Sequence, residues 1–216
     1  DQILVIAEAG VNHNGDINLA RDLIDAASEA GADYIKFQTF QANKLATISA
    51  PKAKYQEETN LSNESQFEML KKLELSKAMH RELLNYSTEK NIKFLSTAFD
   101  IESLEFLVND LKLDINKIPS GEITNSPLLL AHARTGNRLI LSTGMSTIED
   151  IKEALAVIAY GLLNPNGEPT KNSINHAFEN PDGQKKLQEN VVLLHCTSEY
   201  PAELNDINLK AMQTLR

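Results

Sequence analysis

Several common classes of function lack their usual signals in this sequence. Only one cysteine is present, Cys196, so no internal disulfide can form, which fits a reducing compartment and predicts a cytoplasmic location. No run of residues is apolar and long enough to span a bilayer. Lysine and arginine number 21 against 30 aspartates and glutamates, a formal net charge of −9. This balance argues against a nucleic acid or a membrane as the main partner.

Nucleotide-binding and metal-binding motifs are also missing. Residues 10–15 have the glycine spacing of a phosphate-binding P-loop, but Asp16 and Ile17 stand where lysine and serine or threonine are required. No GxGxxG follows a predicted strand. His13 and His195 belong to no metal-ligand spacing such as HExxH, so we predict that both are framework residues.

Short apolar runs are present, and several end in charged and hydroxylic residues. Such runs alternate with segments of helical periodicity, which are preceded by capping residues at Asp16, Ser76 and Asp100 and by a capping-box spacing at Ser146 and Glu149. Strand and helix alternate about six times, an order that favours parallel strands. The fold class is therefore α/β. We favour a (β/α)8 TIM barrel of which residues 1–216 hold about the first six units, over an open sheet.

Two segments interrupt this alternation. Residues 39–64 form a long polar excursion, which suggests a lid, a partner contact or disorder. Residues 162–189 are rich in asparagine, proline, glycine and charge, so we expect a surface insertion that is disordered.

The polar strand ends predict a binding site, because the carboxyl ends of barrel strands converge on one face. Lys36, Lys117, Ser120 and Ser142 suit a phosphate or a carboxylate through charge-assisted hydrogen bonds. The alternative is that the lysines form structural salt bridges with neighbouring glutamates.

Two glutamates lie at the predicted strand ends as well. Glu8 and Glu122 are candidates for proton transfer or for holding sugar hydroxyls. The alternative is a pair of ion-paired core carboxylates, and the residues alone do not decide between the two.

Six motifs occur in an order that is similar to one known family. They are AEAGVNHNGD, IKFQTF, APKAKYQ, KIPSGEITN, LSTGMST and LHCTSEYPA. On these motifs the chain resembles the sialic acid synthase family, which includes N-acetylneuraminate, legionaminate and pseudaminate synthases. The resemblance implies a TIM-barrel enzyme that condenses phosphoenolpyruvate with an N-acyl aminohexose and releases phosphate.

The resemblance also implies roles for individual residues. Glu8 or Glu122 would be the water-activating base, and Gln38 would lie near the sugar. The phosphoenolpyruvate contacts would be Lys36, Lys117, Ser120, Ser142, Ser198 and Tyr200. A divalent metal, commonly manganese in this family, would have its two histidine ligands beyond residue 216. A C-terminal antifreeze-like domain, also beyond residue 216, would reach the partner subunit's site in a homodimer.

We expect an N-acetylneuraminate synthase that uses N-acetylmannosamine. One alternative is an N,N'-diacetyllegionaminate or pseudaminate synthase that uses a diacetamido-trideoxyhexose. Another is a phosphoenolpyruvate synthase acting on a sugar phosphate, although no surplus of cations for a second phosphate is evident. An alternative of a different class is a catalytically silent barrel that serves as a binding module.

Overall fold

The computed structural model describes residues 3–47, 65–197 and 202–216. The chain separates into two compact units, Asp1–Lys112 and Leu113–Arg216, and each is described by itself. In both units the strands are parallel and are paired in chain order. The expectation of alternating strands and helices is confirmed in both units, and the class is α/β.

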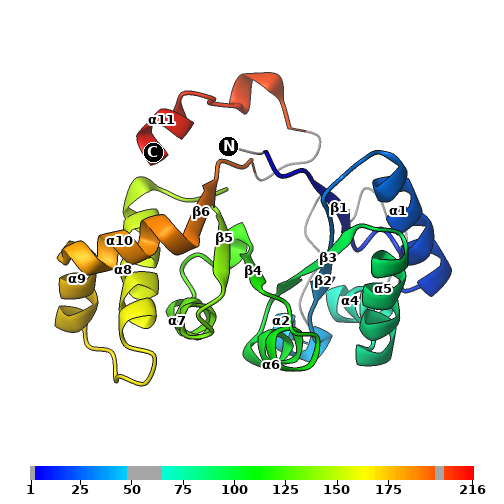
Figure 1. The fold of residues 1–216 in the computed structure, drawn as a ribbon, viewed down its shortest axis with the longest axis horizontal. Coiled ribbons are helices and arrows are strands. Elements are labelled where there is room, and N and C mark those ends of the chain that lie inside the picture. Colours follow the sequence, from blue (N-terminus) through cyan, green and yellow to red (C-terminus); the bar gives the residue numbers. More distant parts are fainter. Residues whose placement is uncertain (1–2, 48–64, 198–201) are drawn as a thin grey trace. The chain divides into compact units, whose positions relative to one another are not determined.

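The first unit is built on three strands, β1 (Ile6–Gly10), β2 (Tyr34–Thr39) and β3 (Lys93–Ala98) (Figure 1). Their register places Glu8 opposite Lys36 and Gln38 opposite Thr97. Because side chains alternate between the faces of a strand, Lys36 and Gln38 share one face of β2, while Phe37 and Thr39 occupy the other.

Helices of the first unit begin where capping residues stand in the sequence. Asp16 accepts a hydrogen bond from the Asn18 amide at the start of α1 (Ile17–Glu29), as predicted. Asp100 caps α6 (Ile101–Glu105), which continues into a π-helical turn, η1 (Phe106–Asp110). The other helices are α2 (Ala42–Leu45), α4 (Gln66–Leu73) and α5 (Lys77–Glu89).

A buried hydrogen-bond network lies behind β2 and β3. His80 of α5 is fully buried, and its Nε2 lies 2.7 Å from Thr39 Oγ1, which in turn lies 2.7 Å from Ser96 Oγ. His80 Nδ1 lies 3.0 Å from the Ser76 carbonyl oxygen, which can only accept, so Nδ1 carries the proton. The network fixes α5 against the strands whose other face carries Gln38 and Thr97.

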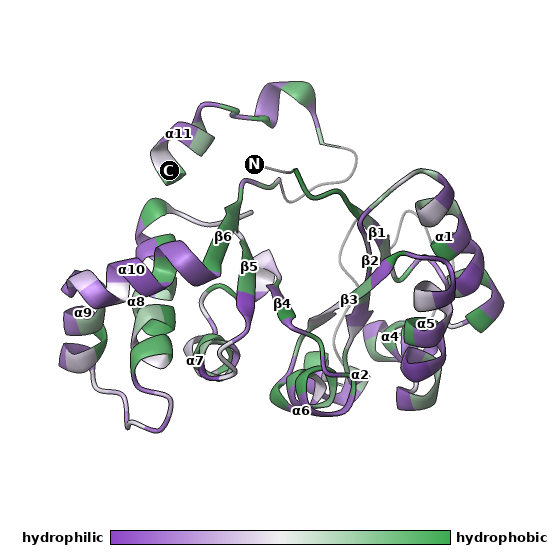
Figure 2. Cartoon of the chain, viewed as in Figure 1, coloured by the Kyte–Doolittle hydropathy of each residue, from purple (hydrophilic) through white to green (hydrophobic). Residues whose placement is uncertain are grey.

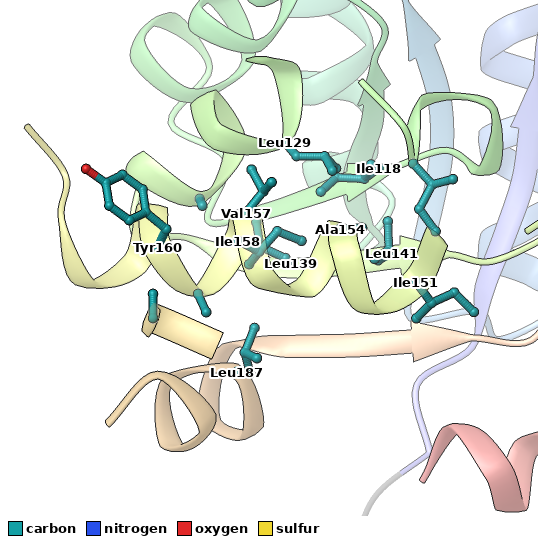
Figure 3. Packing of buried hydrophobic residues seen from close by; sticks show 14 residues of the cluster. Ile118, Leu129, Leu139, Leu141, Ile151, Ala154, Val157, Ile158, Tyr160 and Leu187 are labelled. Atoms are coloured by element: carbon teal, nitrogen blue, oxygen red, sulfur yellow. The ribbon is translucent and has the colours of Figure 1, made fainter. Parts of the chain in front are cut away.

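The second unit is built on β4 (Ile115–Ile118), β5 (Arg138–Ser142) and β6 (Val191–Leu194). Figure 3 shows its core, where Ile118, Leu139 and Leu141 of the strands pack with Leu129 of α7 (Ser126–Arg134) and Ile158 of α8 (Ile148–Leu163). Two 3-10 turns, η2 (Ser120–Glu122) and η3 (Leu204–Asp206), and the short α11 (Ala211–Leu215) complete the unit.

The expectation of disorder in 162–189 is wrong. This segment contains α9 (Lys171–Glu179) and α10 (Pro181–Asn190), and Ala177 and Leu187 are buried in the core of the second unit. The residues that suggested disorder are helix signals, because Thr170 and Asn180 are N-caps and Pro181 occupies the first helical position. Figure 2 shows that α10 is mainly hydrophilic, so its few apolar residues carry the packing.

The capping box of α8 starts one residue later than predicted. Thr147 is the N-cap, and its hydroxyl accepts from the Asp150 amide while Asp150 accepts from the Thr147 amide. The Ser146 hydroxyl instead donates to the Gly144 carbonyl oxygen at 3.2 Å.

Of the polar excursion at 39–64, residues 48–64 lie outside the described residues. In the described ranges, no helix has the length and apolar character needed to cross a membrane.

His132 predicts acid sensitivity of the second unit. It is 1% exposed, and burial, aided by the positive charge of Lys117, lowers its pKa to about 3. As pH falls below the ordinary value near 6.5, the unfolded chain takes up the proton first, so stability is lost progressively between about pH 6.5 and 3. We expect a loss of about 2 kcal/mol at pH 5 from this residue.

The measurement is urea unfolding of the full-length protein at pH 7 and pH 5. In the variant His132→Leu the loss between the two pH values should shrink by about 2 kcal/mol. His176 on α9 is exposed, so His176→Gln serves as the matched control and should leave the loss unchanged. An equal acid loss in His132→Leu and in the unmodified protein would contradict the assignment.

Candidate functional site: polar clusters at the strand ends

The first cluster stands at the ends of β1, β2 and β3. The Lys36 ammonium forms an ion pair with the Glu8 carboxylate and donates to Thr97 Oγ1 at 3.3 Å. The Lys36 side chain is 12% exposed, whereas that of Glu8 is 49% exposed. A Cβ placed at Gly10 would lie 3.1 Å from a Glu8 carboxylate oxygen and 3.9 Å from Gln38 Nε2, so these two side chains border the same spot. The structure therefore brings three predicted site residues together.

The second cluster stands at the ends of β4 and β5. Lys117 is 7% exposed, and its ammonium donates to Ser142 Oγ at 2.7 Å and to the Ile118 carbonyl oxygen at 2.9 Å. Ser120, in the turn η2, accepts a hydrogen bond from the Gly144 amide at 3.0 Å. Parallel pairing of β4 with β5 places these strand ends side by side, as the sequence predicted.

The two serines are oriented by the donors that they meet. Ser142 Oγ accepts from Lys117, and Ser120 Oγ accepts from a backbone amide. A hydroxyl has one donor hydrogen in addition to its acceptor lone pairs, and an oxygen that already accepts can direct its hydrogen elsewhere. A buried ammonium bonded to one such hydroxyl, with a second such hydroxyl in the turn that follows the same strand, suits an anion.

Glu122 lies on the same 3-10 turn as Ser120 and is partly buried. Its carboxylate accepts a hydrogen bond from Asn125 Nδ2 at 2.7 Å, and Asn125 also caps α7. Glu8 by contrast is held by an ion pair. Both carboxylates keep acceptor capacity, and the choice between them as a proton acceptor stays open.

Two predicted contacts, Ser198 and Tyr200, lie outside the described residues. His195 is partly buried at the end of β6 and sits in no group of ligands. Within the described ranges, no three histidine, cysteine, aspartate or glutamate side chains gather in a way that would hold a metal ion. The divalent cation that the resemblance implies stays a prediction, with its ligands expected beyond residue 216.

Thr97 and Gly144 contact candidate residues but were given no role in the site from the sequence. Thr97 had a signal, because it ends a predicted strand in the same way as the residues that were chosen. Gly144 had a weaker signal, because a glycine acts here through its backbone amide and its small size. Neither property follows from residue type at one position.

Parallel strands in chain order, followed by helices and ending in polar side chains, define an α/β protein whose candidate binding residues lie at the carboxyl ends of its strands. Comparison with known proteins gives the family. The model of the NeuB family matches residues 23–216, and the chain belongs to that family.

Curated relatives include two N,N'-diacetyllegionaminic acid synthases. The protein of Campylobacter jejuni is 48% identical over 213 residues, which are 99% of this chain and 57% of the relative. That of Legionella pneumophila is 44% identical over 98% of this chain and 53% of the relative. The human N-acetylneuraminate-9-phosphate synthase is 29% identical over 96% of this chain. The chain thus spans about half the length of these relatives.

Two solved structures of similar proteins resemble this chain in fold and in sequence. The N-acetylneuraminic acid synthetase of Leptospira borgpetersenii superposes with a TM-score of 0.74 at 32% identity, over 100% of this chain and 61% of that one. The spore coat polysaccharide biosynthesis protein SpsE of Bacillus subtilis superposes with a TM-score of 0.68 at 31% identity, over 99% of this chain and 49% of that one.

Proposed function

We propose that this chain is part of a nonulosonic acid synthase that condenses phosphoenolpyruvate with an N-acyl aminohexose and releases phosphate. The observation that carries the proposal is the buried Lys117 of β4 bonded to Ser142 at the end of β5, with Ser120 in the turn that follows β4. One ammonium and two oriented hydroxyls match the carboxylate and phosphate of phosphoenolpyruvate. The names of the NeuB-family relatives support the reaction class.

The product that we propose is N,N'-diacetyllegionaminate. The relatives at 48% and 44% identity carry that name, whereas the N-acetylneuraminate-9-phosphate synthases are 29% identical. The first expectation, N-acetylneuraminate made from N-acetylmannosamine, is therefore less favoured than its alternative. The proposed sugar substrate is 2,4-diacetamido-2,4,6-trideoxymannose.

In the proposed reaction, C3 of phosphoenolpyruvate forms a bond to the aldehyde carbon of the open-chain sugar, and the aldehyde oxygen takes up a proton to become a hydroxyl. Water then adds at C2, and the C2–O bond to the phosphoryl group breaks as C2 becomes a ketone, which releases inorganic phosphate. The two protons of the water balance the one gained by the aldehyde oxygen and the one that leaves with the phosphate. Lys117, Ser120 and Ser142 hold the anion, since their donors lie at adjacent strand ends. Either Glu8 or Glu122 accepts the proton of the attacking water.

The second lysine of the proposed site, Lys36, can exchange its ion-pair partner for substrate. Lys36 pairs with Glu8 and also donates to Thr97, so it can hold a substrate oxygen while Glu8 moves from ion pair to proton acceptor. Gln38 borders Glu8 and offers an amide to a sugar hydroxyl. Ser198 and Tyr200 are proposed as further phosphoenolpyruvate contacts.

Several features of the whole protein belong to the same proposal. We propose a complete (β/α)8 barrel to which residues 1–216 contribute the first six units, in a cytoplasmic homodimer. A divalent cation, manganese by the resemblance, would have its ligands beyond residue 216. No step of the reaction above is assigned to it, because the described residues do not gather ligands for it.

The test is phosphate release from phosphoenolpyruvate by the full-length protein with manganese and a panel of sugars. We expect turnover with 2,4-diacetamido-2,4,6-trideoxymannose and a kcat/KM at least about tenfold lower with N-acetylmannosamine, which lacks the second acetamido group and carries a C6 hydroxyl. A preference for N-acetylmannosamine would restore the first expectation. Absence of phosphate release with every sugar would favour the silent binding module.

A further inference from the structure

The turn at residues 143–146 ties the ends of three strands together. Both the amide and the hydroxyl of Thr143 donate to the Leu194 carbonyl oxygen of β6, at 3.1 and 2.9 Å. The amide of Gly144 donates to Ser120 Oγ, beyond β4. The Ser146 hydroxyl donates to the Gly144 carbonyl oxygen, so both polar groups of the Gly144 backbone are held.

Gly144 has little room for a side chain. A Cβ there would lie 3.0 Å from Ser120 Oγ, 3.3 Å from the Thr197 carbonyl oxygen and 3.5 Å from Cys196 Cβ. Its φ lies outside the left-handed region, so alanine is allowed by backbone conformation and is opposed by space alone. The close approach of Ser120 and of the chain after β6 therefore favours glycine, and a methyl group here would displace the Ser120 hydroxyl.

The amide of Gly144 sets the direction of the Ser120 hydroxyl. An N–H group can only donate, so it occupies a lone pair of Ser120 Oγ and leaves the hydroxyl hydrogen to be donated to another group. Ser142 is arranged in the same way by Lys117. Two serines at neighbouring strand ends are thus both prepared as donors, one by a side chain and one by a backbone amide.

We infer that Gly144 is a positioning residue, whose amide orients Ser120 as a hydrogen-bond donor to the anionic substrate. The inference rests on the proposed function, since phosphoenolpyruvate is the anion. Gly144 itself need not touch the substrate, because it acts through the Ser120 oxygen. This role predicts that the effects of substitutions at Gly144 and at Ser120 on KM for phosphoenolpyruvate are not independent.

A double-mutant cycle tests the coupling in the full-length enzyme. KM and kcat for phosphoenolpyruvate are measured for Ser120→Ala, Gly144→Ala and the double variant. Each single change should raise KM by about tenfold with kcat altered by less than about threefold, because one hydrogen bond to a charged group is lost. KM of the double variant should stay within about twofold of that of Ser120→Ala.

The outcomes separate the inference from the proposed function. Multiplicative effects of the two changes, or an unaltered KM in Gly144→Ala, would overturn the positioning role while leaving the synthase intact. Unaltered kinetics in Ser120→Ala would instead remove Ser120 from the anion site. Gly121→Ala provides the matched control, because a Cβ there meets nothing within 4 Å, and it should leave folding unchanged.

Amide hydrogen exchange provides a second measurement that needs no change at Gly144. In Ser120→Ala the Gly144 amide loses its acceptor, so its exchange should accelerate by at least about tenfold. The Thr143 amide, which is bonded to Leu194, is the internal control and should keep its rate. An unchanged rate at Gly144 would refute the contact on which the positioning role depends.

Discussion

Replacing Lys117 by methionine should lower kcat/KM for phosphoenolpyruvate by about 10²–10³-fold, the range found when a preorganised donor is removed from an active site. Methionine has a similar length and is apolar, so it can occupy a position that is 7% exposed. The change removes the positive charge and also the donor that holds Ser142 Oγ. Ser142 is then free to turn its hydrogen away from the substrate. The measurement is steady-state phosphate release at saturating sugar.

Lys152→Met is the matched control for this prediction. Lys152 is an exposed residue of α8, so the same substitution there should leave kcat/KM within about twofold. Urea unfolding of both variants separates binding from folding. If Lys117 is only structural, its variant will lose stability while KM for phosphoenolpyruvate stays unchanged, and the anion site at β4 and β5 will have to be abandoned.

The neighbours within each cluster could be predicted because they follow from strand direction. Residues that end adjacent parallel strands lie at one edge, so Lys117 and Ser142 were expected near each other. The ion pair of Lys36 with Glu8 is the structural alternative that the sequence left open for the lysines. Neither pairing needed knowledge of loop conformation. The predictions succeeded where a single physical rule, parallel register, controls the distance.

Other contacts depend on backbone geometry that residue types do not encode. The hydrogen bond from Gly144 to Ser120 needs a turn of one particular shape, in which Met145 takes a left-handed φ of 62° that disfavours a side chain. The capping box of α8 likewise could not be placed from residue types alone. Ser146 with Glu149 and Thr147 with Asp150 satisfy one rule equally well, and the contact of Ser146 with the Gly144 carbonyl decides between them.

The segment 162–189 was misjudged because composition was weighed above position. Asparagine, proline and glycine lower helix propensity inside a helix, but at a first turn they cap it or fit its geometry. Asn180 accepts from the Asp182 amide, and Pro181 follows directly. Gly183 was counted as a sign of disorder, although the packing of α10 requires it. That requirement gives a sharp test of the fold.

Replacing Gly183 by alanine should destabilise the second unit by about 3 kcal/mol or more, the upper range for overpacking a core. A Cβ at this position would lie 1.8 Å from the Ala177 carbonyl oxygen, a backbone atom of α9 that cannot turn aside. The helices α9 and α10 would have to separate, which exposes Ala177 and Leu187. Urea unfolding of the full-length protein, followed by exchange of the α8 amides, measures the effect.

Gly121→Ala is again a suitable comparison, because the same added methyl group meets open space. Helix propensity favours alanine over glycine by up to about 1 kcal/mol, so a Gly183→Ala variant that is as stable as, or more stable than, the unmodified protein would indicate a solvated helix without close packing. In that case the first expectation for 162–189, a disordered surface insertion, would be the better description. If instead exchange accelerates only at the amides of α8, α9 and α10, Gly183 lies where these three helices pack. That is the position at which its Cβ would clash with α9.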